Sequence, residues 1–294
     1  MAMKTIPRFY AGADMPSAAM RHAYHHDGVL VIEGFASTDR CRALMDRVSE
    51  LVAGYEPPER SSVFETEGQS HAADDYFQTS GDKIRFFFEA GAFDDEGAFV
   101  VDKEQAVNKI GHALHDLDPV FDAFSRDPRL AALASGLGLD DPGLIQSMFI
   151  VKPPRIGGEV NCHQDATFLH TDPVSCTGFW FALEDATLEN GCLKAVPGAH
   201  RAPLTERFHY DETGSLVMDT LAEPAWDDAD VVPLEAPAGT LVVLHGLLPH
   251  LSGPNTSEKS RRAYALHVVD RATRWADDNW LRRGDDMPVR GFAD

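Results

Sequence analysis

Two histidines and one aspartate in this chain have the residue types and spacing of a metal-binding face. His163 and Asp165 stand two residues apart, so on an extended strand their side chains point the same way. His250 lies far downstream, where a later strand could bring a third ligand to the same place. Two imidazoles and one carboxylate can occupy one face of an iron(II) ion and leave the other face open for a co-substrate and dioxygen. We therefore predict that His163, Asp165 and His250 are the metal ligands and form the catalytic centre.

An arginine accompanies these three residues. Arg261 follows His250 by eleven residues, a separation that is typical of adjacent strands. Its guanidinium group is a planar fork that can bind a carboxylate through two hydrogen bonds. The four residues together indicate an oxygenase that uses iron(II), with 2-oxoglutarate and O2 as co-substrates.

A second histidine competes with His250 for the third ligand position. His245 precedes His250 by five residues, an odd separation that aims the two side chains at opposite faces of a regular strand. Only His250 has the spacing to Arg261 described above, so we expect His245 to be a packed or hydrogen-bonded neighbour of the site. Cys162 directly precedes His163, and for the same geometric reason we expect its side chain to lie outside the site.

The elements that position these residues differ between the two halves of the chain. Residues 15–26 and 37–52 have helical patterning, with Ser37 as an N-cap, and the pattern returns over residues 103–137. After Pro142 the chain changes to short apolar runs between turn residues, which is typical of an antiparallel sandwich or barrel. The predicted strands are residues 28–35, 145–151, 178–183, 192–196, 231–234, 240–244 and 263–270.

These patterns predict a mainly β fold with flanking helices. Its core is a double-stranded β-helix, a cupin-like jelly-roll, over about residues 141–272, with a helical N-terminal half over about residues 15–140. No internal repeat or low-complexity linker divides the chain, so residues 1–294 are predicted to form a single domain. The polar segments 56–82 and 201–230 are too long for simple connections, and we expect them to meet over the open end of the barrel as a lid.

The composition limits the partners and the location of the protein. Lys and Arg number 26 against 47 Asp and Glu, and the resulting net charge of −21 would repel nucleic acid and anionic membranes. The N-terminus lacks the apolar run of an export signal, and no apolar stretch is long enough to span a bilayer. The four cysteines show no CxxC spacing, so we expect thiols in a reducing cytoplasm. The predicted partner is a small-molecule substrate.

Several motifs resemble one known family, the phytanoyl-CoA dioxygenases. The resemblance extends from about Arg21 to Trp280. The metal motif is shared by many oxygenases, whereas the stretches 80–89 and 108–115 are more specific. The motifs are Asp27-Gly28, His163-Gln164-Asp165, residues 80–89, residues 108–115, residues 189–193, residues 197–200, and His250-x-Ser252 with Arg261.

The resemblance also assigns roles to residues around the co-substrate. It makes His163, Asp165 and His250 the iron ligands. It further makes Ser252 and Arg261 the partners of the distal carboxylate of 2-oxoglutarate. The remaining positions that match the co-substrate pocket of close relatives are Lys109, Met148 and Trp180.

Each of the last three residues has a physical role that fits. The ammonium group of Lys109 could neutralise a carboxylate, whereas Met148 and Trp180 could exclude water. Met148 and Trp180 would equally suit the core of any barrel, and for Lys109 a structural role stays open.

The resemblance implies hydroxylation of a C–H bond in a small molecule, with release of succinate and CO2. The alternatives are a cupin-like protein that binds a metal or ligand without oxidation, and an isomerase or hydrolase that uses another divalent metal. Neither alternative needs Arg261 or Ser252, which favours the oxygenase. Asp165 argues against a halogenase, because related halogenases carry a small residue in its place. No cluster of basic residues indicates a CoA phosphate site, and the sequence leaves the substrate open.

Overall fold

A computed structural model describes residues 5–56, 63–64, 75–94, 96 and 98–293 of the chain. The helices are α1 (Ala18–Asp27), α2 (Thr38–Gly54), α3 (Asp75–Gln78), α4 (Lys103–Ala106), α5 (Leu114–Leu117), α6 (Pro119–Ser125) and α7 (Pro128–Gly136). The short 3-10 helices are η2 (Ala90–Ala92), η3 (Asp165–Thr167), η4 (Ala199–Arg201) and η5 (Asp228–Asp230). The strands are β1 (Arg8–Tyr10), β2 (Val29–Glu33), β3 (Val63–Phe64), β4 (Ile84–Glu89), β5 (Val107–His112), β6 (Pro142–Ile150), β7 (Val160–His163), β8 (Thr171–Asp172), β9 (Thr177–Ala182), β10 (Leu193–Ala195), β11 (Glu206–Tyr210), β12 (Leu216–Thr220), β13 (Val232–Leu234), β14 (Leu241–His245), β15 (His250–Ser252), β16 (Ala263–Asp270), β17 (Arg274–Trp275) and β18 (Arg290–Gly291).

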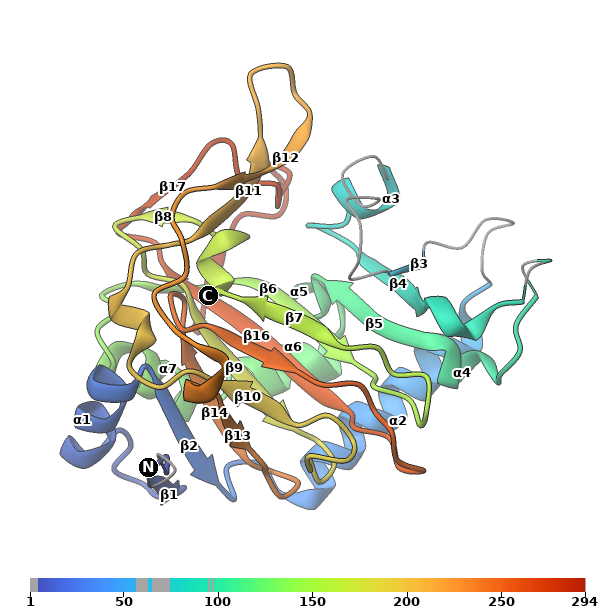
Figure 1. Cartoon of the computed structure of the whole chain (residues 1–294), viewed down its shortest axis with the longest axis horizontal. Coiled ribbons are helices and arrows are strands. Elements are labelled where there is room, and N and C mark those ends of the chain that lie inside the picture. The colour runs from blue at the N-terminus through green and yellow to red at the C-terminus, as the bar shows by residue number, and fades with distance from the viewer. Residues whose placement is uncertain (1–4, 57–62, 65–74, 95, 97, 294) are drawn as a thin grey trace.

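Two sheets form the core, and the predicted jelly-roll is confirmed. The larger sheet has the order β1-β2-β14-β9-β16-β6-β5-β4-β3, with β18 also paired to β6. The smaller sheet has the order β13-β10-β15-β7 and faces the larger one (Figure 1). Side chains from both sheets fill the space between them, including Val31 and Trp180 from the larger sheet and Ala195 and Leu234 from the smaller.

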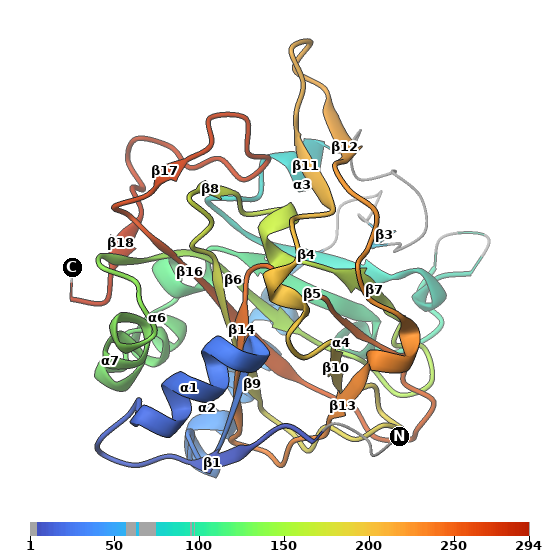
Figure 2. The ribbon, with the colours of Figure 1, turned by 60° about the vertical axis from the view of Figure 1, so that its left-hand side comes forward.

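Helices cover the outer face of the larger sheet. Alternation along β16 places Tyr264 and Leu266 outward, where they join the same core cluster as Leu44 and Val48 of α2. In Figure 2 helices α1, α2, α6 and α7 lie on one side of this sheet, and the smaller sheet lies on the other. Burying each such side chain stabilises the fold by about 1.5–3 kcal/mol. Packing on the outer face of the larger sheet therefore contributes much of the stability. Part of the inner face is available to form a site.

The predicted C-terminal strands are confirmed as β6, β9, β10, β13, β14 and β16. The strand predicted over residues 28–35 is β2, and the helix over 37–52 is α2. Ser37 caps α2, since its side chain accepts a hydrogen bond from the backbone N–H of Arg40. The first helix begins only at Ala18, because Ser17 is its N-cap.

The prediction of helical structure over residues 103–137 was wrong in part. Val107–His112 is strand β5, and Ile84–Glu89, for which no element was predicted, is strand β4. β5 lies between β4 and β6 and forms antiparallel ladders with both. These partners are distant in sequence, so the local apolar pattern could not reveal the pairing that overrides it.

Most of the first polar segment, residues 56–82, lies outside the described residues, and its described end contains α3. The second segment, residues 201–230, shows no clear periodicity in the sequence but contains the antiparallel hairpin β11–β12. Gly214 forms the turn with a φ of +80°, a conformation that favours glycine. The hairpin projects from the body of the molecule at the top of Figure 1.

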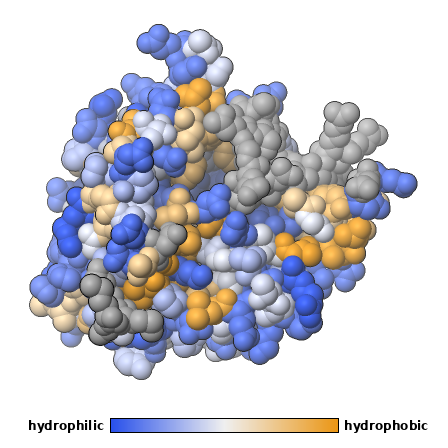
Figure 3. Space-filling model, viewed as in Figure 1, coloured by the Kyte–Doolittle hydropathy of each residue, from blue (hydrophilic) through white to orange (hydrophobic). Residues whose placement is uncertain are grey.

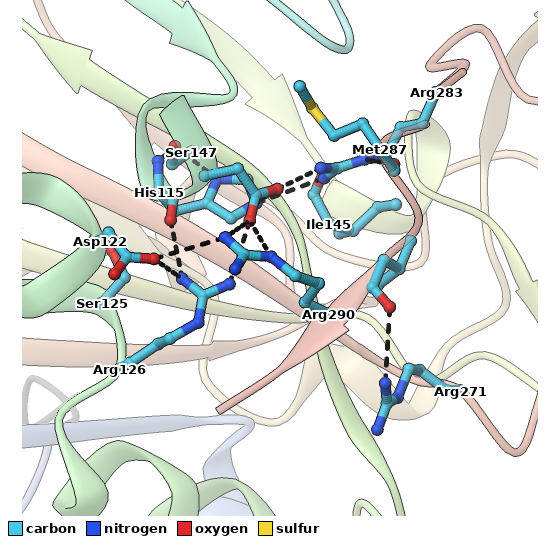
Figure 4. Close-up of polar contacts among 12 residues, drawn as sticks. His115, Asp122, Ser125, Arg126, Ile145, Ser147, Arg271, Arg283, Met287 and Arg290 are labelled. Carbon is cyan, nitrogen blue, oxygen red and sulfur yellow. Dashed lines mark hydrogen bonds and ion pairs between the residues drawn. The ribbon is translucent and has the colours of Figure 1, made fainter. Parts of the chain in front are cut away.

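A buried carboxylate fixes the C-terminal segment to the helical layer. Asp116 on α5 accepts hydrogen bonds from Arg283 and from the Nη2 atoms of Arg290, at 2.7 Å, and Arg126, at 3.0 Å. The three guanidinium groups converge from different elements (Figure 4). Burial alone raises the pKa of Asp116, but its contacts with His115, Arg283 and Arg290 outweigh burial and hold the pKa well below its usual range. Asp116 therefore stays ionised and joins residues 283–290 to the core.

Replacing Asp116 with asparagine is expected to lower the free energy of unfolding by about 3–5 kcal/mol, because buried arginines lose their counter-charge. The control Asp122→Asn affects a half-exposed carboxylate and should cost only about 0.2–1 kcal/mol. Since the folded pKa of Asp116 is depressed, its contribution is present above the unfolded pKa of about 3.9 and is lost as the pH falls below it. Urea denaturation at several pH values measures both effects. Equal stability of the two variants at neutral pH would contradict the prediction.

Candidate metal centre and co-substrate pocket

Three potential metal ligands meet at the end of the smaller sheet. His163 is the last residue of β7, His250 is the first residue of β15, and the two are directly paired across these antiparallel strands. Asp165 follows at the start of η3. Its Oδ1 lies 3.7 Å from His163 Nε2 and 3.6 Å from His250 Nε2, and the candidate ligand atoms all lie within 4.8 Å of one another. This set is the only such group of His, Cys, Asp and Glu side chains found within the described residues.

Backbone carbonyls orient both imidazoles. His163 Nδ1 lies 2.8 Å from the carbonyl oxygen of Asn161, and His250 Nδ1 lies 3.0 Å from that of Leu248. A carbonyl only accepts, so Nδ1 carries the proton in each ring and Nε2 presents its lone pair toward Asp165. The arrangement gives each histidine the tautomer that a metal ligand requires.

Gln164 holds the segment between the two ligands of the HxD motif. Its buried side chain donates to the carbonyl of Leu247 at 2.8 Å and accepts from the backbone N–H of Thr205 at 2.9 Å. Gln164 thereby ties β7 to the turn before β15 and to the segment that leads into the β11–β12 hairpin. The sequence analysis assigned no role to this residue.

The charges of the three groups suit a divalent cation. Burial lowers the pKa of His163 to about 4, and the nearby His250 adds to the effect, so His163 is neutral at physiological pH. Burial by itself raises the pKa of Asp165, but the imidazoles of His250 and His267 outweigh it and hold the pKa well below its usual range. Asp165 therefore supplies one negative charge to the group.

A second feature of the cavity is a pair of buried polar atoms without protein partners. Arg261 is only 2% exposed, and its Nε donates to the carbonyl of Gly191 at 3.1 Å. Its Nη1 and the Oγ of Ser252 are both buried, and neither has a hydrogen-bond partner among the described residues. The two residues lie close together, because Ser252 pairs with Leu193, two residues after Gly191. Buried polar atoms are nearly always satisfied, so this pair indicates a missing anionic or polar ligand.

Arg261 remains a cation in this environment. Burial lowers its pKa to about 10, which is still well above physiological pH. Gly191 is required beside it, since its φ is +80° and a Cβ there would lie 2.6 Å from the carbonyl oxygen of Gly253. A carboxylate that accepted from Arg261 Nη1 and Ser252 Oγ would satisfy both atoms.

One row of inward-facing residues crosses three neighbouring strands of the larger sheet. Trp180 on β9, Ala265 on β16 and Met148 on β6 are paired across neighbouring strands. The next row on the same face carries His267, whose ring lies beside Asp165. The guanidinium carbon of Arg261 lies 5.4 Å from the centre of the Trp180 ring. Trp180 and Met148 thus lie on the inner face of the larger sheet, in the row next to His267, and Trp180 also lies beside Arg261.

Lys109 lies on the same inner face, on β5. Its Nζ is 5.4 Å from the ring centre of Phe87 and 5.7 Å from that of Phe77. Burial lowers the pKa of Lys109 to about 7. Its ammonium group is therefore only partly protonated at neutral pH, and a bound carboxylate would favour the charged form.

His245 ends β14, outside the ligand group. Its Nδ1 accepts a hydrogen bond from the backbone N–H of Leu247 at 3.1 Å, and its ring centre lies 5.0 Å from that of His200. Burial lowers the pKa of His245 to about 4, and His200 contributes to the shift. Cys162 is exposed on the side of β7 away from the ligand group.

Aromatic side chains extend from the ligand group toward the hairpin. The ring of Phe168 lies 5.9 Å from that of His163 and 5.8 Å from that of Phe208 on β11. Phe208 in turn lies 6.4 Å from Phe77 and 6.5 Å from Trp280. In the space-filling view the surface is hollowed beside the hairpin (Figure 3). The segment 201–230 therefore contributes Phe208 to an aromatic group that begins beside His163.

Sequence reasoning missed two residues of the site, His267 and Gly178. His267 Nε2 lies 3.4 Å from Asp165 Oδ2, and Gly178 is its neighbour on β9. The available signal was the run Ala263, Ala265 and His267 at alternate positions after Arg261, which places all of them on one face of β16.

Two imidazoles and a carboxylate at the end of a jelly-roll sheet, together with a buried arginine, define a class of metal centre with open coordination positions. The comparison with known families agrees with this class. The family model for phytanoyl-CoA dioxygenase (PhyH) matches residues 24–263. The chain belongs to the phytanoyl-CoA dioxygenase (PhyH) family.

Similar proteins of other organisms match nearly the whole chain. A "Phytanoyl-CoA dioxygenase" of Arabidopsis thaliana is 48% identical over 261 residues, which cover 88% of this chain and 91% of the relative. The "Phytanoyl-CoA dioxygenase domain-containing protein 1" of Bos taurus is 44% identical over 281 residues, covering 92% and 97%.

Solved structures share the fold at lower sequence identity. The epimerase SnoN, crystallised with Fe3+, alpha ketoglutarate and nogalamycin RO, has a TM-score of 0.62 at 17% identity and covers 93% of this chain and 91% of its own. EctD from S. alaskensis, crystallised with 2-oxoglutarate and 5-hydroxyectoine, has a TM-score of 0.60 at 21% identity. The match covers 91% of this chain and 84% of the EctD chain. In the described part of the chain no helix is long and apolar enough to cross a membrane.

Proposed function

We propose that this protein is an iron(II)- and 2-oxoglutarate-dependent dioxygenase that hydroxylates a C–H bond of a small molecule and releases succinate and CO2. One observation carries the proposal: the strand that supplies His250 also carries Ser252, whose buried Oγ, like Nη1 of the buried Arg261, has no partner among the described residues. A metal-binding protein that performs no oxidation has no need of the second feature. Membership of the PhyH family supports the same reading.

The residues fit the absent groups as follows. The Nε2 atoms of His163 and His250 and one oxygen of Asp165 would hold iron(II), and Arg261 with Ser252 would hold the distal carboxylate of 2-oxoglutarate. When bound, iron(II) with 2-oxoglutarate and dioxygen supplies the oxidising power for attack on a C–H bond.

The rest of the chain contributes positioning and exclusion of water. Trp180 and Met148 flank the path between the metal ligands and Arg261 and would keep water from the co-substrate. Lys109 adds a cation on the same face when it is protonated. The rings of Phe168 and Phe208 form an apolar wall beside His163, against which a substrate carbon could be placed.

Hydroxylation is the outcome we propose, although the solved neighbours named as an epimerase and a carbocyclase perform other reactions with the same fold. The substrate must therefore be identified together with its product. The negative charge of the chain disfavours nucleic acid and anionic membranes and supports a small molecule as the substrate.

The test is a metabolite screen with purified protein, iron(II), 2-oxoglutarate and ascorbate, scored by succinate release above the substrate-free rate. Mass spectrometry of each active mixture should then show a product that has gained one oxygen atom. Metal binding without any 2-oxoglutarate consumption would favour the non-oxidative binding protein. Turnover of a substrate without 2-oxoglutarate would favour the isomerase or hydrolase.

A further inference from the structure

The two oxygens of the Asp165 carboxylate have different surroundings. Oδ1 faces the Nε2 atoms of His163 and His250 at 3.7 and 3.6 Å. Oδ2 faces away from them, toward Nε2 of His267 on β16, at 3.4 Å. That distance exceeds an ordinary N–H···O hydrogen bond, and the buried Oδ2 has no hydrogen-bond partner among the described residues.

A glycine makes room for this contact. Gly178 on β9 is paired with His267 and lies on the same inner face. A Cβ at position 178 would lie 2.9 Å from Asp165 Oδ2 and 3.6 Å from the His267 ring. The first distance is shorter than real side chains tolerate, so either the carboxylate or the ring would have to move. Gly178 and His267 together form a notch that receives Oδ2. A side chain at position 178 would fill this notch.

The chemistry of the contact indicates which atom carries the hydrogen between His267 and Asp165. An ionised carboxylate only accepts hydrogen bonds, so the His267 nitrogen that faces it carries a hydrogen. A donor on Oδ2 favours binding of the metal through Oδ1 alone. If both oxygens bound the metal, the carboxylate would occupy one of the positions that a chelating co-substrate and dioxygen need.

We infer that His267 is a positioning residue, which holds Asp165 Oδ2 in the Gly178 notch so that the carboxylate binds the metal through Oδ1 only. The inference rests on the proposed function, because it assumes a metal at the triad. It is supported by the burial of His267, whose Nδ1 has no partner among the described residues. A purely apolar packing role would be filled better by leucine, which leaves no buried nitrogen unsatisfied.

Three variants separate positioning from packing. His267→Leu removes the donor at similar volume, whereas His267→Gln can place an N–H near the position of Nε2. Gly178→Ala keeps His267 but closes the notch. Metal-free protein is titrated with Co(II), whose visible spectrum reports ligand number and geometry, first alone and then with 2-oxoglutarate.

His267→Leu is expected to weaken Co(II) binding about 10- to 100-fold, the range typical for loss of a polar group that orients a metal ligand. Its Co(II) spectrum should also change. His267→Gln should restore affinity and spectrum toward the wild type, and Gly178→Ala should resemble His267→Leu. Wild-type affinity and spectrum in His267→Leu, or equal defects in the Leu and Gln variants, would overturn the inference.

Two further measurements keep the result interpretable. Circular dichroism checks folding, and if His267→Leu does not fold, His267→Asn replaces it, because its shorter side chain stops short of Oδ2. The Asn variant should show the same weakened binding, and wild-type binding in it would overturn the inference. If wild-type protein binds neither Co(II) nor 2-oxoglutarate, the proposed function itself fails. Normal wild-type binding with no effect of the substitutions rejects only the role of His267.

Discussion

Replacing Asp165, His163 or His250 with alanine will abolish substrate-stimulated succinate release and weaken iron(II) binding by more than about 100-fold. Loss of a hydrogen bond to a metal ligand typically weakens metal binding by up to about 100-fold, and loss of the ligand itself should have a larger effect. Each substitution leaves two protein ligands, too few to hold an ion in a site with open positions. Asp165→Ala also removes the one negative charge that the triad supplies. Metal content and Co(II) titration of the purified variants measure the effect, and succinate assays give its consequence for turnover.

His245→Ala is the matched control for this experiment. It removes a half-buried imidazole that lies on the same chain segment as His250 but contacts His200 and the backbone of Leu247. Its iron affinity should equal that of the wild type. Loss of metal in His245→Ala together with normal binding in His250→Ala would show that the wrong histidine was chosen as the third ligand.

Arg261→Ala will raise the 2-oxoglutarate concentration needed for half-maximal turnover by roughly ten- to hundredfold and leave iron affinity nearly unchanged. A charge-assisted contact to a carboxylate contributes about 1.5–3 kcal/mol, which corresponds to that range. Titration of 2-oxoglutarate with the iron(II) protein, and separately with Co(II), distinguishes co-substrate binding from metal binding. An unchanged titration would place the co-substrate elsewhere.

The adjacent arginine provides the control. Arg262 is half-buried and pairs with Glu104 at 3.0 Å, so Arg262→Ala should leave the titration as in the wild type. Lys109→Ala should act in the same direction as Arg261→Ala if its ammonium group meets a carboxylate. Because the pKa of Lys109 is lowered to about 7, its charge is lost as the pH rises through 7. The difference between wild type and Lys109→Ala should therefore be largest below that pH.

The sequence by itself determined those features that depend on local spacing. An HxD pair on an extended segment must present both side chains on one side, and the structure has His163 at the end of β7, an extended Gln164, and Asp165 at the start of η3. Short apolar runs between turn residues were sufficient to predict six strands of the jelly-roll, because alternation and punctuation are properties of the local chain. The parity of their separation does not apply to His245 and His250 in the structure, because the two histidines lie on different strands, β14 and β15.

The tertiary structure decided everything that depends on partners distant in sequence. Val107–His112 became a strand because β4 and β6 lie on either side of it, although its local pattern suggested a helix. The contact of His267 with Asp165 joins residues about a hundred positions apart, and the space for it comes from Gly178 on a third element. The unsatisfied Arg261 Nη1 and Ser252 Oγ became visible only once burial and hydrogen bonds were known. Periodicity reports which face of an element is apolar, but only packing determines which faces meet and which buried polar atoms remain for a ligand.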